Sequence, residues 1–156
     1  MILDSNLFFD PAGTAITVTA DSTNILDMLN ARDMGIGEDM KVTVTSNLAF
    51  AAVGAATLQI SLLGAPDNGS GSPGTWVIYA ETDALSKAEL NDPTVQNISL
   101  VGFDLPERRQ GQKPPRFYKL TYTVATGPFT AGAVQAFVNL SRDQLPQYPS
   151  GFTVAN

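Results

Sequence analysis

The side chains that could carry chemistry in this chain are carboxylates, hydroxyls and basic groups, because the sequence contains neither histidine nor cysteine. Without these two residue types there is no Ser–His pair, no thiolate nucleophile and no zinc site built on His or Cys. Pairs among the 15 acidic residues could act as a glycosidase. Most of these acids lie beside turn residues, however, where carboxylates accept hydrogen bonds from backbone N–H groups. We therefore predict that the protein is not an enzyme and that it needs no cofactor.

A polar loop at residues 64–74 contains the best candidate for a cation site, Asp67-Asn68-Gly69. Hard cations such as Ca²⁺ bind the side-chain oxygens of Asp and Asn. A calcium loop also needs a later acidic ligand, and residues 70–79 contain no Asp or Glu. We therefore favour a flexible turn rich in Gly, Ser and Pro over a metal site.

The segment at residues 106–119 is the most basic part of the chain. It holds five of the nine basic residues, and Pro114-Pro115 stiffens it. One interpretation is a solvated loop that keeps the protein soluble, which is the more common role of an exposed charge run. The other is an electrostatic contact with an acidic protein surface, in which guanidinium groups bind carboxylates in pairs. The residues that would make this contact are Arg108, Arg109, Lys113 and Arg116.

The distribution of charge excludes some classes of partner. The net charge is −6, and 13 of the 15 acidic residues but only 3 of the 9 basic residues lie in residues 1–106. Nucleic-acid binding needs a broad positive surface, so we predict no DNA or RNA partner. The N-terminus lacks the basic region of a secretory signal, and the uncharged stretch at residues 42–65 alternates polar with apolar residues. We therefore predict a protein made in the cytoplasm that does not bind membranes.

The hydrophobic pattern has a period of two, which is typical of strands with one face on a core and the other toward water. The alternation is strongest at residues 40–50, 57–62, 118–124 and 134–140, and weaker at residues 14–19, 23–28, 75–81 and 95–103. The one stretch that favours a helix is residues 83–91, which Asp92-Pro93 ends.

These patterns predict an all-β domain spanning residues 1–156: a jelly-roll-like β-sandwich of about eight antiparallel strands, with at most one short helix. Long loops between the strands favour Greek-key connections over simple hairpins. No repeat or linker divides the chain.

Both ends of the chain are apolar without a periodic pattern, at residues 1–9 and 145–156. Free tails are normally polar and charged. We therefore interpret both ends as extended contact arms that pack on their own sandwich or on another subunit. The candidate contact residues in these arms are Ile2, Leu3, Leu7, Phe8, Tyr148 and Phe152.

Six short segments carry a further signal in their order and spacing. They are MILDSNLF (1–8), TNILDM (23–28), ARDMGIGE (31–38), RFYKLTYTV (116–124), GPFTAG (127–132) and YPSGFTV (148–154). In these segments the chain resembles the small capsid cement proteins of tailed bacteriophages. The resemblance spans nearly the whole chain, and residues 64–110 depart from it most.

The resemblance implies a jelly roll on the outer surface of a capsid of the HK97 type, where it clamps neighbouring major capsid proteins. It also implies that the protein acts as a small homo-oligomer, for which a dimer is favoured and a trimer is the alternative. A ligand that binds the assembled shell and not the separated subunits stabilises the shell by mass action. An acidic protein also avoids adhering to the packaged genome.

Two other functions compete with this one. A carbohydrate-binding jelly roll for host-surface recognition would need exposed aromatic side chains beside Asp, Asn or Arg, and Trp76 is the only tryptophan. A hydrolase that uses carboxylates alone is disfavoured by the absence of His and Cys.

Overall fold

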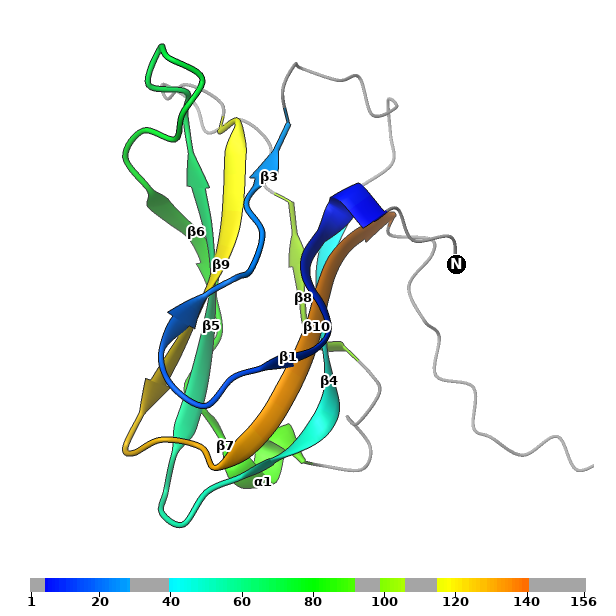
Figure 1. The fold of residues 1–156 in the computed structure, drawn as a ribbon, viewed down its shortest axis with the longest axis vertical. Coiled ribbons are helices and arrows are strands. Elements are labelled where there is room, and N and C mark those ends of the chain that lie inside the picture. The colour runs from blue at the N-terminus through cyan, green and yellow to red at the C-terminus, as the bar shows by residue number, and fades with distance from the viewer. Residues whose placement is uncertain (1–4, 29–39, 92–98, 106–114, 141–156) are drawn as a thin grey trace, which may run out of the picture.

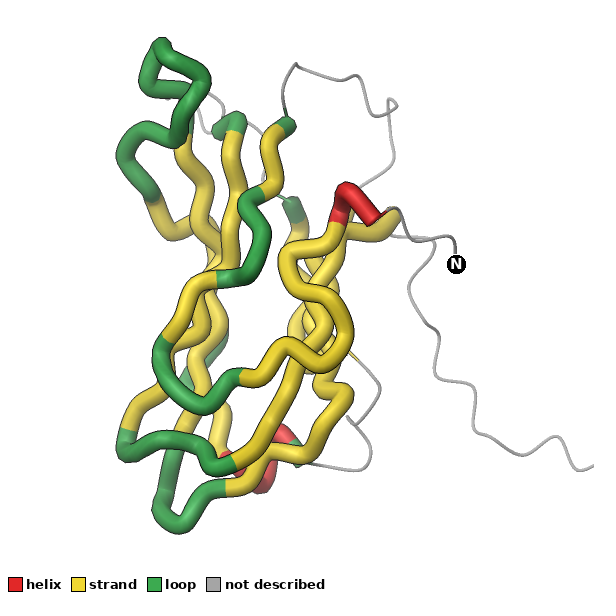
Figure 2. The backbone as a smooth tube through the Cα atoms, in the orientation of Figure 1, coloured by secondary structure: helices red, strands yellow, loops and turns green. Residues whose placement is uncertain are grey.

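The computed structural model describes residues 5–28, 40–91, 99–105 and 115–140, which form two antiparallel sheets packed face to face (Figure 1). The strands of the first sheet, in spatial order, are β1 (Phe8–Ala15), β10 (Ala131–Leu140), β4 (Met40–Ala51) and β8 (Ser99–Asp104). Those of the second are β2 (Ala20–Asp21), β9 (Phe117–Ala125), β5 (Thr57–Ala65) and β6 (Val77–Glu81), with β3 (Leu26–Asp27) on β9 and β7 (Leu85–Ser86) on β5. Among these residues the helical elements are the 3₁₀ turn η1 (Ser5–Leu7) and α1 (Lys87–Leu90) (Figure 2).

The strand order is that of a jelly roll. When β2 with β3, and β6 with β7, each count as one broken strand, the described chain has eight strand positions. The first position pairs with the last, the second with the seventh, the third with the sixth and the fourth with the fifth, and all these pairs are antiparallel. This is a long hairpin rolled into two sheets. The predicted all-β sandwich of about eight strands is confirmed.

The core lies between the sheets and is built by the alternation seen in the sequence. On β5 the side chains of Leu58, Ile60 and Leu62 are fully buried, and on β9 those of Leu120 and Tyr122 face them across the register. Each large apolar side chain removed from water contributes about 1.5–3 kcal/mol, so these two central strands fix the second sheet. Most of the buried apolar side chains among the described residues belong to one hydrophobic cluster.

The first strand differs from its prediction. The sequence placed a strand at residues 14–19, whereas β1 runs from Phe8 to Ala15. Its pairing with β10 shifts register twice, between Phe8 and Asp10 and between Asp10 and Thr14, and Gly13 has a φ of +88°. Because these irregularities interrupt the period of two, the alternation gives no signal over β1.

Other boundaries are shorter than predicted. The strand expected at residues 23–28 is reduced to β3, and the helix expected at residues 83–91 is the single turn α1. Ser86 and Glu89 form a capping box at its start: the Ser86 hydroxyl accepts from the Glu89 N–H, and the Glu89 carboxylate accepts from the Ser86 N–H.

Residues 5–9 of the predicted N-terminal arm pack on their own sandwich, one of the two alternatives that the sequence leaves open. Phe9 is fully buried in the core, Leu7 packs against it, and the Phe8 ring lies 5.8 Å from the Phe137 ring on the outer face of the first sheet. Residues 5–9 therefore belong to the sandwich because their apolar side chains pack on it. Residues 1–4 and the predicted arm at 145–156 lie outside the described residues.

A buried carboxylate ties the two sheets together at their open edge. Asp10, on β1 of the first sheet, accepts hydrogen bonds from the Tyr122 hydroxyl (2.6 Å) on β9 of the second sheet. Its other oxygen accepts from the Thr23 N–H and hydroxyl, both at 2.8 Å, in the loop between β2 and β3. An unpaired buried carboxylate would be costly, so these three donors determine where β1 can sit against the second sheet.

We predict that Tyr122→Phe lowers the free energy of unfolding by about 1–3 kcal/mol, because it leaves a buried carboxylate oxygen without its donor. Chemical denaturation followed by circular dichroism measures the change, and Tyr79→Phe, outside this cluster, is the matched control. A loss no larger than that of the control would show that Asp10 does not depend on Tyr122.

Folding also changes the titration of two tyrosines. Burial raises the pKa of Tyr118 to about 12, and burial together with the Asp10 carboxylate raises the pKa of Tyr122. Because folding raises these pKa values, the folded state holds more protons than the unfolded state above about pH 10, and stability must fall as the pH rises further.

We expect an alkaline titration of tyrosinate absorbance to show Tyr118 and Tyr122, two of the four tyrosines, ionising only as the protein unfolds. Circular dichroism at each pH reports the fold. Ionisation of all four near pH 10 with the sandwich intact would contradict the burial of these hydroxyls.

Candidate interaction site

The structure places three of the ten predicted contact residues and brings them to one end of the sandwich. Leu7 and Phe8 lie where η1 meets β1, and Arg116 directly precedes β9. The other seven lie outside the described residues and stay predictions: Ile2, Leu3, Arg108, Arg109, Lys113, Tyr148 and Phe152.

Arg116 joins two acidic residues of its own chain. Its Nε and Nη2 donate to the two oxygens of Asp27 at 2.7 and 2.8 Å, a bidentate pair, and its Nη1 donates to Asp67. The backbone adds two bonds, from the Arg116 N–H to the Ala65 carbonyl (2.9 Å) and from the Met28 N–H to the Arg116 carbonyl (2.8 Å). One guanidinium therefore fastens β3, β9 and the loop after β5 to one another.

The electrostatics of this group, which we call the Arg116 clip (Asp27, Asp67 and Arg116), follow from these contacts. The Asp27 carboxylate, and then Asp67, raise the pKa of the Arg116 guanidinium. The N–H groups of Gly69 and Gly71, helped by Arg116, lower the pKa of Asp67. All three side chains are charged at neutral pH. Among the described residues, the contacts of Arg116 are those of a structural link within the chain.

Lys119, a basic residue on β9, is also paired with a carboxylate of its own chain. The Lys119 ammonium lies 2.6 Å from the Asp21 carboxylate on β2 and 4.9 Å from the centre of the Trp76 ring. The Thr121 hydroxyl also donates to Asp21 at 2.6 Å. The bonds from Lys119 and Thr121 lower the pKa of Asp21. The outer face of the second sheet thus pairs its own charges.

The loop at residues 66–74 is organised by its own hydrogen bonds. Asp67 accepts from the N–H groups of Gly69 (2.7 Å) and Gly71 (3.0 Å), and the Asn68 N–H donates to the Ser72 carbonyl (3.0 Å). Both oxygens of Asp67 therefore accept hydrogen bonds within the chain, one from the two glycines and the other from Arg116. Over the described residues there is no group of three or more Asp, Glu, His or Cys that could hold a metal.

The same loop contains the spacing GxGxxG in Gly69, Gly71 and Gly74, which in dinucleotide-binding folds joins a strand to a helix. Here it joins the antiparallel strands β5 and β6, and no helix follows it. Without a helix N-terminus behind the glycines, the loop lacks the donors and dipole that bind a phosphate group.

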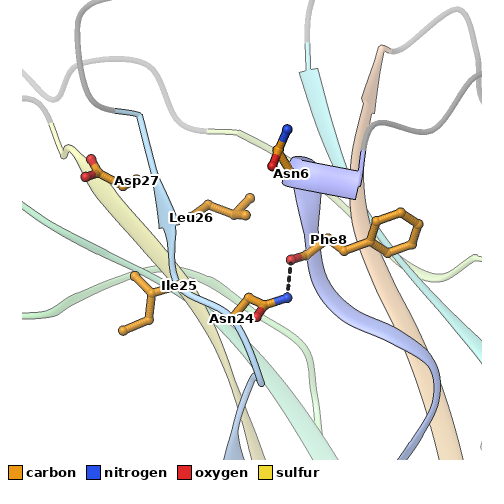
Figure 3. Close-up of a pocket in the computed structure, with 6 residues that line it drawn as sticks. All are labelled: Asn6, Phe8, Asn24, Ile25, Leu26 and Asp27. Carbon is orange, nitrogen blue, oxygen red and sulfur yellow. Dashed lines mark hydrogen bonds between the residues drawn. The ribbon is translucent and has the colours of Figure 1, made fainter.

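A hollow of about 250 Å³ opens beside the clip, between the start of the first sheet and β3 of the second (Figure 3). Asn24 spans it, donating from its side chain to the Phe8 carbonyl (3.1 Å) and from its backbone to the Phe9 carbonyl (2.9 Å). Small-molecule sites usually exceed about 300 Å³, so the hollow is smaller than a usual small-molecule site. The residues that line it are Asn6, Phe8, Asn24, Ile25, Leu26 and Asp27.

The hollow does not have the composition of a catalytic site. Asp27 is the one titratable side chain in its lining, and its carboxylate is bound by Arg116. General acid–base chemistry needs two such groups or a nucleophile with its base. In the part of the chain that the structure describes, no helix is long and apolar enough to cross a membrane.

The fold and these surfaces define a jelly-roll β-sandwich whose described charges are largely paired within the chain. Comparison with known families matches residues 11–138 to the Bbp16 family. The chain therefore belongs to the Bbp16 family. No curated protein matches the sequence at a significant level.

We predict that the Arg116 clip stabilises the fold through both carboxylates. Arg116→Ala should lower the midpoint of thermal unfolding, and the loss should shrink by more than half when Asp27→Asn and Asp67→Asn are already present, because the partners are then gone. Since folding lowers the pKa of Asp67, its contribution is present at neutral pH and disappears as the pH falls toward that lowered pKa. Equal losses in the two backgrounds would contradict the clip.

Proposed function

We propose that this protein is a structural component of a bacteriophage virion that binds the outer surface of an assembled HK97-type capsid and clamps neighbouring major capsid proteins. The observation that carries the proposal is the ordered set of segments that resembles the capsid cement proteins of tailed phages. A jelly roll alone would not suffice, since one fold serves many functions.

The structure adds that segments far apart in this set contact each other. Residues 23–28 and 116–124 pair as β3 on β9, with Leu26 opposite Tyr118 and Asp27 opposite Phe117. Thr23 and Tyr122, from the same two segments, bind Asp10, and Arg116 binds Asp27. The resemblance therefore falls on residues that jointly determine the edge of the sandwich, which supports a shared fold over a chance match of short motifs.

A cement protein acts by equilibrium linkage. Any protein that binds the assembled shell and not the free subunits stabilises assembly by RT ln(1 + [L]/Kd), about 2.7 kcal/mol when its concentration is 100 times Kd. No catalytic step is needed, in keeping with a chain that has neither His nor Cys. Repetition over many shell sites multiplies a modest contact.

The partner is then the major capsid protein, and the protein itself is a homo-oligomer on the shell. Further proposed contacts are the basic loop at residues 106–116 and the end segments 1–4 and 145–156. Apart from residues 115 and 116, these segments lie outside the described residues. The glycan-binding alternative has less support, because the Lys119 ammonium covers one face of the Trp76 ring.

We expect the purified protein to co-sediment with assembled phage heads and to leave free capsid subunits in the supernatant. Heads stripped of the protein should release their DNA at a lower temperature, and adding the protein back should restore the higher one. Binding to free subunits with the same affinity as to heads, or no binding to heads, would overturn the proposal, and a bovine albumin control excludes trapping in the pellet.

A further inference from the structure

Three long stretches of the sequence contain no charged residue. They lie between Asp10 and Asp21, between Lys41 and Asp67, and between Lys119 and Arg142. Each includes one loop of the sandwich, at residues 16–19, 52–56 and 126–130 respectively. The chain as a whole carries 24 charged residues among 156, so their absence from all three loops distinguishes this part of the surface from the Arg116 clip.

The loops at residues 52–56 and 126–130 lie at the lower end of the sandwich in Figure 1, and the loop at residues 16–19 lies above them in the lower half. The Ile16 N–H donates to the Gly132 carbonyl (3.0 Å), the Phe129 N–H to the Thr17 carbonyl (2.9 Å) and the Thr130 N–H to the Ala51 carbonyl (2.7 Å). The Phe129 bond joins two of the loops directly, and the Thr130 bond holds the loop at residues 126–130 to Ala51, the last residue of β4 before the loop at residues 52–56. We call this surface the apolar loop end (residues 16–19, 52–56 and 126–130, with Leu48).

Large aliphatic side chains project from this end into solvent. Val53 is 98% exposed, Val18 is 58% exposed and Leu48, on β4 near the loops, is 55% exposed. They are three of the five large apolar side chains that are exposed over the described residues. Single exposed apolar residues are common, but three of them on or beside loops that contain no charged residue mark a candidate interaction site.

The loops are also supported by buried aromatic side chains. Phe50 and Phe129 stack edge to face under them, with ring centres 5.1 Å apart. Gly132 lies against the Phe50 ring so closely that a Cβ atom there would come within 2.2 Å of it. Thr126 has a φ of +61° and Gly127 a φ of +107°, which makes the turn at residues 126–127 tight. A surface fixed in this way loses little conformational entropy on binding.

Two charged side chains of α1, Lys87 and Glu89, make hydrogen bonds within the chain near this end. The Lys87 ammonium of α1 donates to the Ala52 carbonyl at 3.3 Å, and the Glu89 carboxylate caps α1 through the Ser86 N–H at 2.7 Å. A partner that placed a charge against the valines would have to desolvate it without compensation. The surface therefore fits a protein face that is itself apolar and uncharged.

We propose that the apolar loop end is the surface with which the protein docks on the assembled capsid, against an apolar, uncharged patch of the major capsid protein. This inference rests on the proposed function and names the contact. Three loop tips are few for a stable dimer between copies of this chain, which would need about 1,200–2,000 Å² of buried surface. A homo-oligomer that binds several shell sites at once can use a smaller contact in each copy, because its second contact is intramolecular.

The test compares an aspartate substitution at the apolar loop end with one at an exposed apolar residue elsewhere, both in the full chain. Val53→Asp should raise the Kd for assembled heads by at least about tenfold, since it buries a charge in an apolar contact. Val53→Leu should keep the affinity, and Ile78→Asp, at an equally apolar exposed residue on β6, is the matched control. Val53 is almost fully exposed, so circular dichroism should show unchanged folding.

A loss of affinity in Val53→Asp that is the same at low and at high salt, as expected for an unscreened apolar contact, would support the inference. Unchanged affinity of Val53→Asp, with wild-type protein still binding heads, would overturn it and leave the proposed function standing. A Val53→Asp effect on the oligomeric state of the free protein, with head binding intact, would show that this end joins copies of the chain and would equally overturn the inference. Failure of the wild type to bind heads would refute the proposed function itself.

Discussion

The position of β1 depends on one buried carboxylate. Asp10 has its hydrogen-bonding capacity met by Tyr122 and Thr23, all from the opposite sheet or its loop. A polar group buried without partners costs several times what a satisfied one gains, so few arrangements of this edge are stable. With Asp10 fixed, Phe9 enters the core, η1 and Phe8 form one wall of the hollow, and β3 meets β9 so that Asp27 reaches Arg116.

The jelly roll gives the described molecule two chemically different ends. Toward one end the Arg116 clip pairs one guanidinium with two carboxylates, and Lys119 pairs with Asp21. At the other end three loops without a charged residue present Val18, Leu48 and Val53. A polarity of this kind suits a protein that adheres through one surface, since the three loops contain none of the charged residues that give the net charge of −6.

Sequence reasoning could predict the sheets but not the contacts between distant residues. The alternation in β4, β5, β9 and β10 is regular, so those strands and the sandwich followed from it. The bulged strand β1 was misplaced because Pro11 and Gly13 interrupt its pattern. Arg116 was singled out for its charge, but its partner Asp27 is 89 residues away and Asp67 is 49 residues away, and no local pattern connects them. The uncharged stretches are visible in the sequence, but only the topology shows that their loops meet.

If the sandwich fixed by Asp10 presents its apolar loop end to an assembled capsid, that end is covered on binding. Amide hydrogen exchange on the protein, free and bound to phage heads, tests this claim most directly, because it reports contact along the whole chain without a substitution. We predict slower exchange on binding at residues 51–56 and 126–130, with unchanged exchange in the loop at residues 66–74. Protection at residues 66–74 and none at the apolar loop end would contradict the account.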